Sequence, residues 1–424
     1  MKRISPKIIH RARFVLIHPE LLLENAAVPV SEEGLVLEPH SQPSKNIENG
    51  VELIDWGDAI ILPGLINAHA HLELTALSRR LTEFSSFTDW AAQLIHQRRT
   101  WTPEDYRRST EEGARLALSS GTTLVGDIAS GYGWDALSGK YPRRVVFEET
   151  LGLAPELAEP AMAKIHALFD RADHGEDRPL QVHAVSPHAP YSTSGELYRR
   201  AAAFAQSRKT PWTTHAAETP EELLFLETGG GEFREFLIRL GALPENRRAP
   251  GAHPVAWLDS LGILGPSCLL AHCNYLDGDA VARIARSKSN VVYCPRSHSF
   301  FGHEKHPIRQ LLDAGVPVAL GTDSLASNDS LSMIDEMRYL YARRKDLASW
   351  EILRAGTVHG AVALGFADRL GRLAPGFLAD MTVLSLPPGI KKDRLTDQVL
   401  EGAGRWLASI INGLKAPSFS ASAT

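Results

Sequence analysis

The residues best suited to chemistry in this 424-residue sequence are histidines and acids that end short apolar runs. His69 and His71 stand two apart at the end of AIILPGLINAHAH, and side chains two apart on a strand point to the same face. His215, His272 and Asp323 each end a later run of this kind. Neutral imidazoles with a carboxylate suit Zn²⁺ or Fe²⁺ and leave a position open for water. The pattern therefore predicts a metal site.

A further acid stands close to one of these histidines. Glu218 follows His215 by three residues and precedes Thr219-Pro220, which is a typical helix start. An acid at this place either complements the helix dipole or takes part in proton transfer. We favour proton transfer, because Glu218 lies beside a candidate metal ligand.

The fold prediction rests on eight apolar runs that alternate with helical patterns between residues 57 and 365. The runs are AIILPGLINAHAH, GTTLVGDIAS, VVFEETLG, LQVHAVSPHAP, PWTTHAAE, CLLAHCNYL, NVVYCPRSH and PVALGTDSLAS. Such alternation favours right-handed βαβ units and a parallel sheet. Eight units close a (β/α)₈ TIM barrel of the α/β class, whose reactive residues lie at the carboxyl ends of the strands. The candidate ligands occupy those ends.

The two ends of the chain have another pattern. Residues 1–56 and 366–424 contain the short strand-like pieces ARFVLIHPELLL, GLVLEPH, VELIDWG and LADMTVLSL. We expect them to form one small, composite β-sandwich beside the barrel. Within the barrel region, the run Gly229–Gly231 should divide the helical segment that follows Thr219 into two helices.

The motifs PGLINAHAH, THAAE, LAHC and LGTDS resemble those of the amidohydrolase superfamily, over nearly the whole chain. The resemblance implies a metal-dependent hydrolase built as a barrel with a companion β-sandwich. Two-metal members usually carry a bridging carboxylated lysine at the end of strand four, whereas LQVHAVSPHAPYS holds no lysine. One divalent metal is therefore implied, Zn²⁺ first and Fe²⁺ second. Its implied ligands are His69, His71, His215 and Asp323.

The resemblance also implies roles for the acids and bases. In one-metal deaminases of this family the histidine that matches His272 helps to activate a water, and Asp323 is a second proton acceptor. The spacing H-x-x-E resembles the deaminase branch, in which the residue matching Glu218 protonates a ring nitrogen and passes a proton to the leaving amine. The metal lowers the pKa of a bound water from about 15.7 toward 7. The expected reaction is hydrolytic deamination of a purine-type ring.

Two segments bear on the substrate. SPHAPYS, residues 186–192, resembles adenosine-like and S-adenosylhomocysteine deaminases and makes His188 a candidate substrate contact. CPRSHSFFGHEKHP, residues 294–307, together with GTDSLASNDSLSMIDEMR, resembles aminofutalosine deaminases of the menaquinone pathway. Their substrate, 6-amino-6-deoxyfutalosine, carries a benzoate.

A benzoate calls for a cationic partner in the protein. Arg296 could bind the carboxylate as a planar fork, with His298 near it. Arg296 could equally pair with an acid of the protein, and Phe300 and Phe301 could be core residues rather than stacking partners. The set of candidate substrate-binding residues is completed by Glu73, Trp90 and Ser324.

Other functions remain open on the same scaffold. These are deamination of S-adenosylhomocysteine, adenosine or a nucleobase, triazine dechlorination, and hydrolysis of a cyclic amide. A catalytically inactive scaffold is disfavoured because all the ligand positions are filled. We expect a small-molecule substrate and allow for a homodimer.

Composition narrows the partners and the compartment. The net charge of −5, without a basic block, argues against nucleic acid. The sequence has no apolar run long enough to span a membrane. Its three cysteines, Cys268, Cys273 and Cys294, form no disulfide framework and predict a cytoplasmic location.

Overall fold

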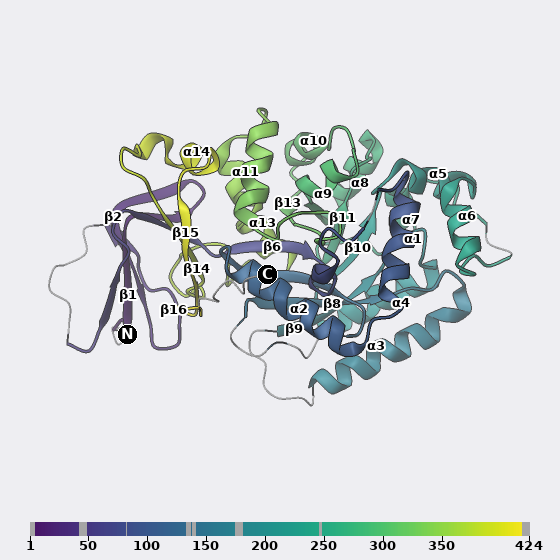
Figure 1. The fold of residues 1–424 in the computed structure, drawn as a ribbon, viewed down its shortest axis with the longest axis horizontal. Coiled ribbons are helices and arrows are strands. Elements are labelled where there is room, and N and C mark those ends of the chain that lie inside the picture. Colours follow the sequence, from purple (N-terminus) through teal and green to yellow (C-terminus); the bar gives the residue numbers. More distant parts are fainter. Residues whose placement is uncertain are drawn as a thin grey trace.

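The structure is a computed structural model that describes residues 5–41, 49–81, 83–132, 137, 141–173, 181–245 and 248–417. Two regions lie side by side (Figure 1): a barrel wrapped by helices, and a smaller sheet that contains both the first and the last strands of the chain. Across the described ranges, the helices are all too short or too polar to cross a lipid bilayer. The three cysteines are buried and free, as expected.

Eight parallel strands form the barrel, in the order of the sequence. They are β6 (Leu65–Ala70), β7 (Thr122–Ala129), β8 (Arg143–Thr150), β9 (Gln181–Pro187), β10 (Trp212–Ala216), β11 (Cys268–His272), β12 (Asn290–Tyr293) and β13 (Val318–Leu320). A parallel bridge between Ala70 and Asp323 brings the end of β13 beside β6. The predicted (β/α)₈ architecture is confirmed, and each predicted apolar run overlaps one of these strands.

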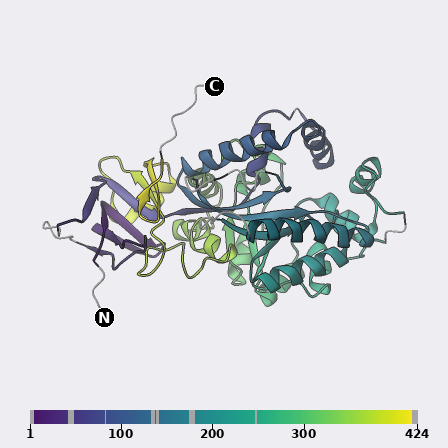
Figure 2. The ribbon, with the colours of Figure 1, turned by 90° about the horizontal axis from the view of Figure 1, so that it is seen from below.

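Helices pack around the barrel on its outer side (Figures 1 and 2). They are α1 (Phe87–Arg98), α2 (Pro103–Leu118), α3 (Ala158–Asp173), α4 (Gly195–Arg208), α5 (Pro220–Thr228), α6 (Glu232–Arg239), α7 (Pro254–Ser260), α8 (Gly278–Ser287), α9 (Pro295–Phe300), α10 (Ile308–Asp313), α11 (Met333–Arg343), α12 (Ser349–Ala355) and α13 (Val358–Ala363). Short 3₁₀ helices span Leu72–Leu77, Pro155–Leu157 and Lys392–Arg394.

Local sequence explains where the two helices nearest the candidate acid begin and end. The side chain of Thr219 accepts a hydrogen bond from the amide of Glu222 and so caps α5, and Pro220 occupies the first turn. Gly229 ends α5 with a φ of 74°, and Gly231 precedes α6 with a φ of 81°. Glycine favours this left-handed backbone, so the predicted division into two helices is confirmed.

The smaller region is one connected sheet in the order β16-β15-β14-β5-β1-β2-β3, with β4 also paired to β1. Its strands are β1 (Ile8–His18), β2 (Leu21–Val30), β3 (His40–Ser41), β4 (Glu52–Asp55), β5 (Ala59–Pro63), β14 (Met381–Ser385), β15 (Arg405–Ile411) and β16 (Leu414–Lys415). The helix α14 (Leu395–Leu400) joins β14 to β15. Strands from both chain ends therefore build the companion β region, as predicted.

The predicted domain boundary needs a correction. The sequence predicts one barrel strand in the run AIILPGLINAHAH, but the first part of this run, β5, pairs antiparallel with β14 in the smaller sheet. The division falls at Gly64, where a Cβ atom would lie 2.1 Å from the hydroxyl of Thr123. Such crowding admits only glycine. The smaller sheet therefore extends to residue 63, and the barrel begins with β6.

A buried ion pair links the barrel to the smaller sheet. Arg143, at the start of β8, donates from Nε to Asp380 Oδ2 at 2.7 Å and from Nη2 to Asp380 Oδ1 at 3.1 Å. The guanidinium also contacts Asn412, whose backbone amide donates to Asp380. Both charged side chains are at most 5% exposed. Each depends on the other, since a lone buried charge is costly.

We predict that Asp380→Ala lowers the free energy of unfolding by about 3–5 kcal/mol, because it leaves the Arg143 guanidinium buried without a counter-charge. Urea denaturation of both proteins measures this difference. The control is Glu104→Ala, which removes an exposed partner of Arg107 on α2 and should leave the midpoint nearly unchanged. Equal effects of the two substitutions would contradict the assigned role of the buried pair.

Candidate metal centre and active site

His69 and His71 lie at the carboxyl end of β6, with ring centroids 5.1 Å apart. His69 is 1% exposed, and neither of its ring nitrogens has a hydrogen-bond partner within the described part of the chain. A buried polar group left unpaired is expensive, and a ligand bond would satisfy it. Burial, followed by the nearby imidazole of His215, lowers the pKa of His69 to about 3. The ring is therefore in the neutral form that binds metals.

Asp323, just after β13, directs one carboxylate oxygen toward these rings. Its Oδ1 atom is 3.9 Å from Nε2 of His69 and 3.6 Å from Nε2 of His71. The other oxygen, Oδ2, accepts hydrogen bonds from the hydroxyls of Ser297, at 2.7 Å, and Ser327, at 3.0 Å. Burial opposes ionisation, but the surrounding imidazoles keep the pKa of Asp323 below its usual value. The carboxylate is thus ionised and held in place.

His215 and His272 complete the cluster from β10 and β11. The His215 ring lies 5.0 Å from that of His69 and 5.5 Å from that of His71. Its Nδ1 atom is 2.9 Å from the carbonyl oxygen of His188, and donation there leaves the lone pair on Nε2. The His272 ring is 5.3 Å from the rings of both His69 and His215. The structure brings all the predicted ligands together.

These residues fit a divalent metal. His69, His71 and Asp323 each place one ligand atom within 4.8 Å of the others, and so do His69, His215 and His272. Neutral imidazoles with a single carboxylate form a donor set that suits Zn²⁺ and Fe²⁺. The unpaired nitrogens of His69 are the observation that most favours an ion at this place.

Glu218 stands beside His272 as the predicted acid. Its Oε1 atom is 3.5 Å from Nε2 of His272, and the side chain of Glu218 is 7% exposed. Burial raises the pKa of Glu218 well above its usual range, and the negative charges of Asp323 and Glu222 raise it further. Both causes favour the protonated carboxyl group, which is the form that a general acid needs.

The strand ends that carry these side chains have an unusual backbone. Ala217, His272, Cys273 and Asp323 all have φ between 50° and 69°. This left-handed conformation costs non-glycine residues on the order of 1–3 kcal/mol and persists only where neighbours enforce it. The amide of Cys273 donates to Ala216 at 3.0 Å, which joins the turn after β11 to β10.

An outer layer of hydrogen bonds holds the backbone of the two proton-transfer candidates. The side-chain amide of Asn274 donates to the carbonyl of Glu218 at 3.0 Å, and His298 Nδ1 lies 3.0 Å from Asn274 Oδ1. Nε2 of His306 donates to the carbonyl of His272 at 2.8 Å. The segment after β12 thus supports the active site from behind.

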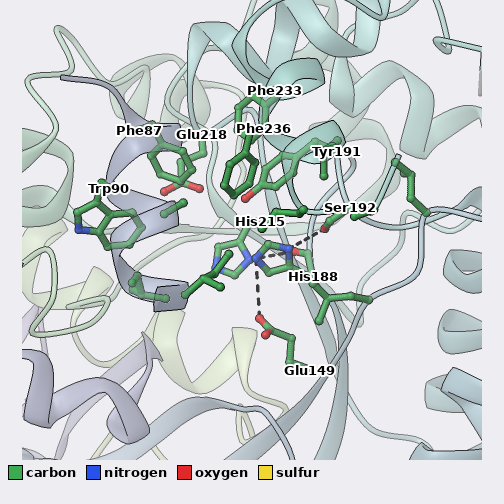
Figure 3. A pocket seen from close by; sticks show the side chains of 18 of the residues that line it. Phe87, Trp90, Glu149, His188, Tyr191, Ser192, His215, Glu218, Phe233 and Phe236 are labelled. Carbon is green, nitrogen blue, oxygen red and sulfur yellow. Dashed lines mark hydrogen bonds and ion pairs between the residues drawn. The ribbon is translucent and has the colours of Figure 1, made fainter. Parts of the chain in front are cut away.

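The metal cluster lies at the floor of a cavity of about 400 Å³, a size typical of small-molecule sites. Figure 3 shows His215, His188 and Glu149 below a group of aromatic rings. Of the predicted substrate-binding residues, His188, Trp90 and Ser324 line this cavity. The indole Nε1 of Trp90 donates to the carbonyl of Ala326 at 3.3 Å, which fixes its ring.

Arg296 and His298 are placed elsewhere, which corrects their predicted role. Arg296 pairs with Asp329, and its Nε lies 4.0 Å from Glu336 Oε1. His298 is buried behind Asn274. Neither side chain lines the cavity. Arg296 thus pairs with acids of the protein, the alternative that its sequence context left open.

The predicted substrate-binding role of Glu73 also needs a correction. Its carboxylate accepts hydrogen bonds from Nη2 of Arg98 at 2.9 Å and from the amide and hydroxyl of Ser130 at 3.0 and 2.7 Å. It is 4% exposed and does not line the cavity. Its contacts are thus with Arg98 and Ser130, outside the cavity.

Phe301 packs against a residue of the cavity lining. Its ring centroid is 5.0 Å from that of Trp90.

Several cavity residues escaped the sequence analysis: Arg98, Glu149, Tyr191, Phe233 and Phe236. The sequence did contain a signal for Glu149. This residue lies near the end of β8, just as the candidate ligands lie at the ends of other strands. Its Oε1 atom is 3.9 Å from Nε2 of His188. Tyr191 lies within SPHAPYS, the segment that made His188 a candidate. Phe233 and Phe236 had no signal, since a helix with an apolar stripe usually faces a core.

We predict that His69→Ala lowers the bound metal to a small fraction of one ion per chain, whereas His188→Ala retains it. His188 lies near His215 and Glu149, but the Nδ1 atom of His215 is committed to the backbone. Metal analysis of the purified variants by mass spectrometry measures both. Loss of metal in His188→Ala would show that this histidine is a ligand.

The comparisons agree with the geometry. Residues 60–417 match the amidohydrolase family. A 5-methylthioadenosine/S-adenosylhomocysteine deaminase of Pyrococcus furiosus is 28% identical over 89% of this chain and 85% of its own length.

Two solved structures share the fold. Helicobacter pylori aminofutalosine deaminase with methylthio-coformycin has a TM-score of 0.83, with 23% identity over 96% of this chain and 99% of that one. Atrazine chlorohydrolase from Arthrobacter aurescens, complexed with zinc, has a TM-score of 0.80, with 21% identity over 96% and 94% of the two chains. With its barrel, its histidine–aspartate cluster and a family match over most of its length, the chain belongs to the amidohydrolase family and is a hydrolase acting on carbon–nitrogen bonds.

Proposed function

We propose that this protein is a hydrolytic deaminase of adenosine-type nucleosides. The observation that carries the proposal is the buried Glu218 carboxyl group, which lies 3.5 Å from His272 at the edge of the ligand cluster and lines the cavity. Burial and nearby negative charges raise its pKa, and a raised pKa suits a carboxyl group that must protonate a purine ring nitrogen. The deaminase name of the Pyrococcus relative supports the same reaction.

The reaction replaces a ring amine by oxygen: the amine and one water become a carbonyl and ammonia. His69, His71, His215 and Asp323 would hold the divalent ion, which would supply Lewis acidity and lower the pKa of a bound water. Glu218 gives its proton to the ring nitrogen next to the reacting carbon. His272 and Asp323 take the proton of the attacking water. Glu218 then regains a proton by proton transfer within the site and donates it to the leaving amine.

Buried Tyr191 and Ser192 lie beside the candidate substrate contact His188. The Ser192 hydroxyl is 2.6 Å from Nδ1 of His188, and the Tyr191 ring meets the His188 ring edge-on at 5.5 Å. Burial lowers the pKa of His188 to about 4, so the ring is neutral. A neutral imidazole with one nitrogen fixed by Ser192 is well suited to a hydrogen bond with a heterocycle or a sugar hydroxyl.

The finer expectation, aminofutalosine as the substrate, is based on the resemblance of residues 294–307 and of GTDSLASNDSLSMIDEMR to aminofutalosine deaminases. The expected partner of its benzoate, Arg296, lies outside the cavity. The likeness to the Helicobacter enzyme concerns the fold. We therefore propose the broader class, adenosine-type nucleosides, and keep aminofutalosine as a compound to be tested.

We predict that Glu218→Gln leaves the metal content unchanged and lowers kcat at least about 10²-fold, because glutamine cannot deliver the proton. Metal analysis and ammonia release from adenosine measure the two effects. Glu221→Gln, three residues further along in the first turn of α5 and outside the cavity, is the matched control and should keep its activity. A Glu218→Gln protein without metal would mean that the carboxylate is a ligand rather than an acid.

We predict ammonia release from adenosine-type nucleosides and none from guanine, cytosine or melamine when zinc is supplied. The nucleosides expected to react are adenosine and 5′-methylthioadenosine, and the panel also contains S-adenosylhomocysteine and aminofutalosine as compounds to be tested. Turnover of melamine instead would place the protein among the triazine hydrolases. A protein with one bound metal that releases ammonia from none of these compounds would refute the deaminase proposal.

A further inference from the structure

We propose that the active-site cavity selects nucleosides whose 5′ substituent is apolar and uncharged, and rejects those whose 5′ substituent carries a carboxylate. This inference rests on the proposed deaminase function and specifies its substrate class. The observation behind it is an outer chamber walled by the apolar faces of α1 and α6, defined by Phe87, Trp90, Leu94, Ile95, Phe233, Phe236, Leu237 and Leu240.

Helix α1 turns a continuous apolar stripe toward the cavity. Phe87, Trp90, Ala91, Leu94 and Ile95 all line it, at the three- and four-residue intervals that share one face of a helix. Within α1, Thr88 is the one fully buried residue. The other side chains of the stripe are only partly buried: they pack against neighbouring core clusters and also line the cavity, so part of their apolar surface is available to a ligand.

Helix α6 provides the facing wall. Phe233, Phe236, Leu237 and Leu240 repeat the same spacing and line the same cavity. The two helices touch at one end, where the Phe87 and Phe233 ring centroids are 6.0 Å apart and the Thr88 hydroxyl donates to Glu232 at 3.2 Å. Tyr191 stacks 4.2 Å from Phe233 and joins this wall to the floor.

The rim of the cavity is apolar as well. Leu151, Leu157 and Leu240 line it while being 52%, 47% and 38% exposed. Large apolar side chains gathered at the mouth of a pocket favour an apolar ligand, since its binding removes them from water. The leucines and the α1 and α6 stripes form one continuous apolar surface from the rim inward.

The charge distribution separates the floor from the outer chamber. The acidic and imidazole side chains of the cavity belong to strand ends and the segments just after them: His71, Glu149, His188, His215, Glu218, His272 and Asp323. The reacting ring must lie there, beside Glu218 and His272. In an adenosine-type nucleoside the 5′ substituent is the end remote from the ring amine, so it extends toward α1 and α6.

Among the cavity-lining residues that the structure describes, Arg98 is the one lysine or arginine. Its charge already has partners: Nη2 donates to Glu73 and to Ser130, and Nε donates to the hydroxyl of Tyr106 at 3.2 Å. A carboxylate in the outer chamber would lose its hydration without gaining a free cation. Desolvation of an unpaired charge strongly opposes binding.

The test compares two nucleosides that differ by one charge: 5′-S-benzyl-5′-thioadenosine and its para-carboxylate. We expect kcat/KM for ammonia release to be at least about 10²-fold higher for the neutral compound. 5′-Methylthioadenosine should exceed S-adenosylhomocysteine in the same direction. Equal or better turnover of the carboxylate would overturn the inference while leaving the deaminase proposal intact. Absence of ammonia from every nucleoside would instead refute the deaminase proposal.

A charge added to the wall should change this preference. Leu240→Arg places a cation at the rim, and we expect it to raise the carboxylate-to-neutral ratio of kcat/KM at least about 10-fold. Ile238→Arg is the matched control: it lies two residues away near the end of α6, is 54% exposed and does not line the cavity. Ile95→Arg, on the facing wall, serves if Leu240→Arg does not fold. Equal ratios in the wall and control variants would overturn the inference.

Discussion

The closure of the barrel between its first and last strands is the contact on which the active site depends. The amides of Thr322 and Asp323 both donate to the carbonyl of His69, at 3.1 and 3.0 Å. The approach is so close that a Cβ on Gly321 would lie 2.8 Å from that carbonyl oxygen, which requires glycine. The backbone that closes the barrel thus carries two opposing ligands, so closure and metal binding should stabilise each other.

Strand ends explain why the sequence predicted the floor of the site well. Each candidate ligand ends an apolar run, and in a parallel barrel all such ends meet on one face. His215 and His272 could therefore be placed together although 57 residues separate them along the chain. The left-handed backbone at His272 and Asp323 could not be predicted, because neither residue is a glycine and the enforcing hydrogen bonds come from distant segments.

The sequence was least informative about the walls, for a physical reason. An apolar stripe on α1 has the same spacing whether it faces a core or a ligand, and only the fold shows that α1 and α6 leave a cavity between them. A side chain's type also says little about its partner. An arginine such as Arg296 can bind a substrate carboxylate, but in this protein it pairs with Asp329. Arg98, which does line the cavity, is paired with Glu73.

The apolar walls also bear on the chemistry at the floor. Burial favours the protonated form of the Glu218 carboxyl group, and the rings and leucines of α1 and α6 line the same cavity. An apolar wall lowers the polarity of the space that it encloses, and low polarity disfavours every charged group there. We therefore expect the outer chamber to act in the same sense on both partners: it favours an uncharged 5′ substituent of the substrate and the uncharged form of the Glu218 carboxyl group.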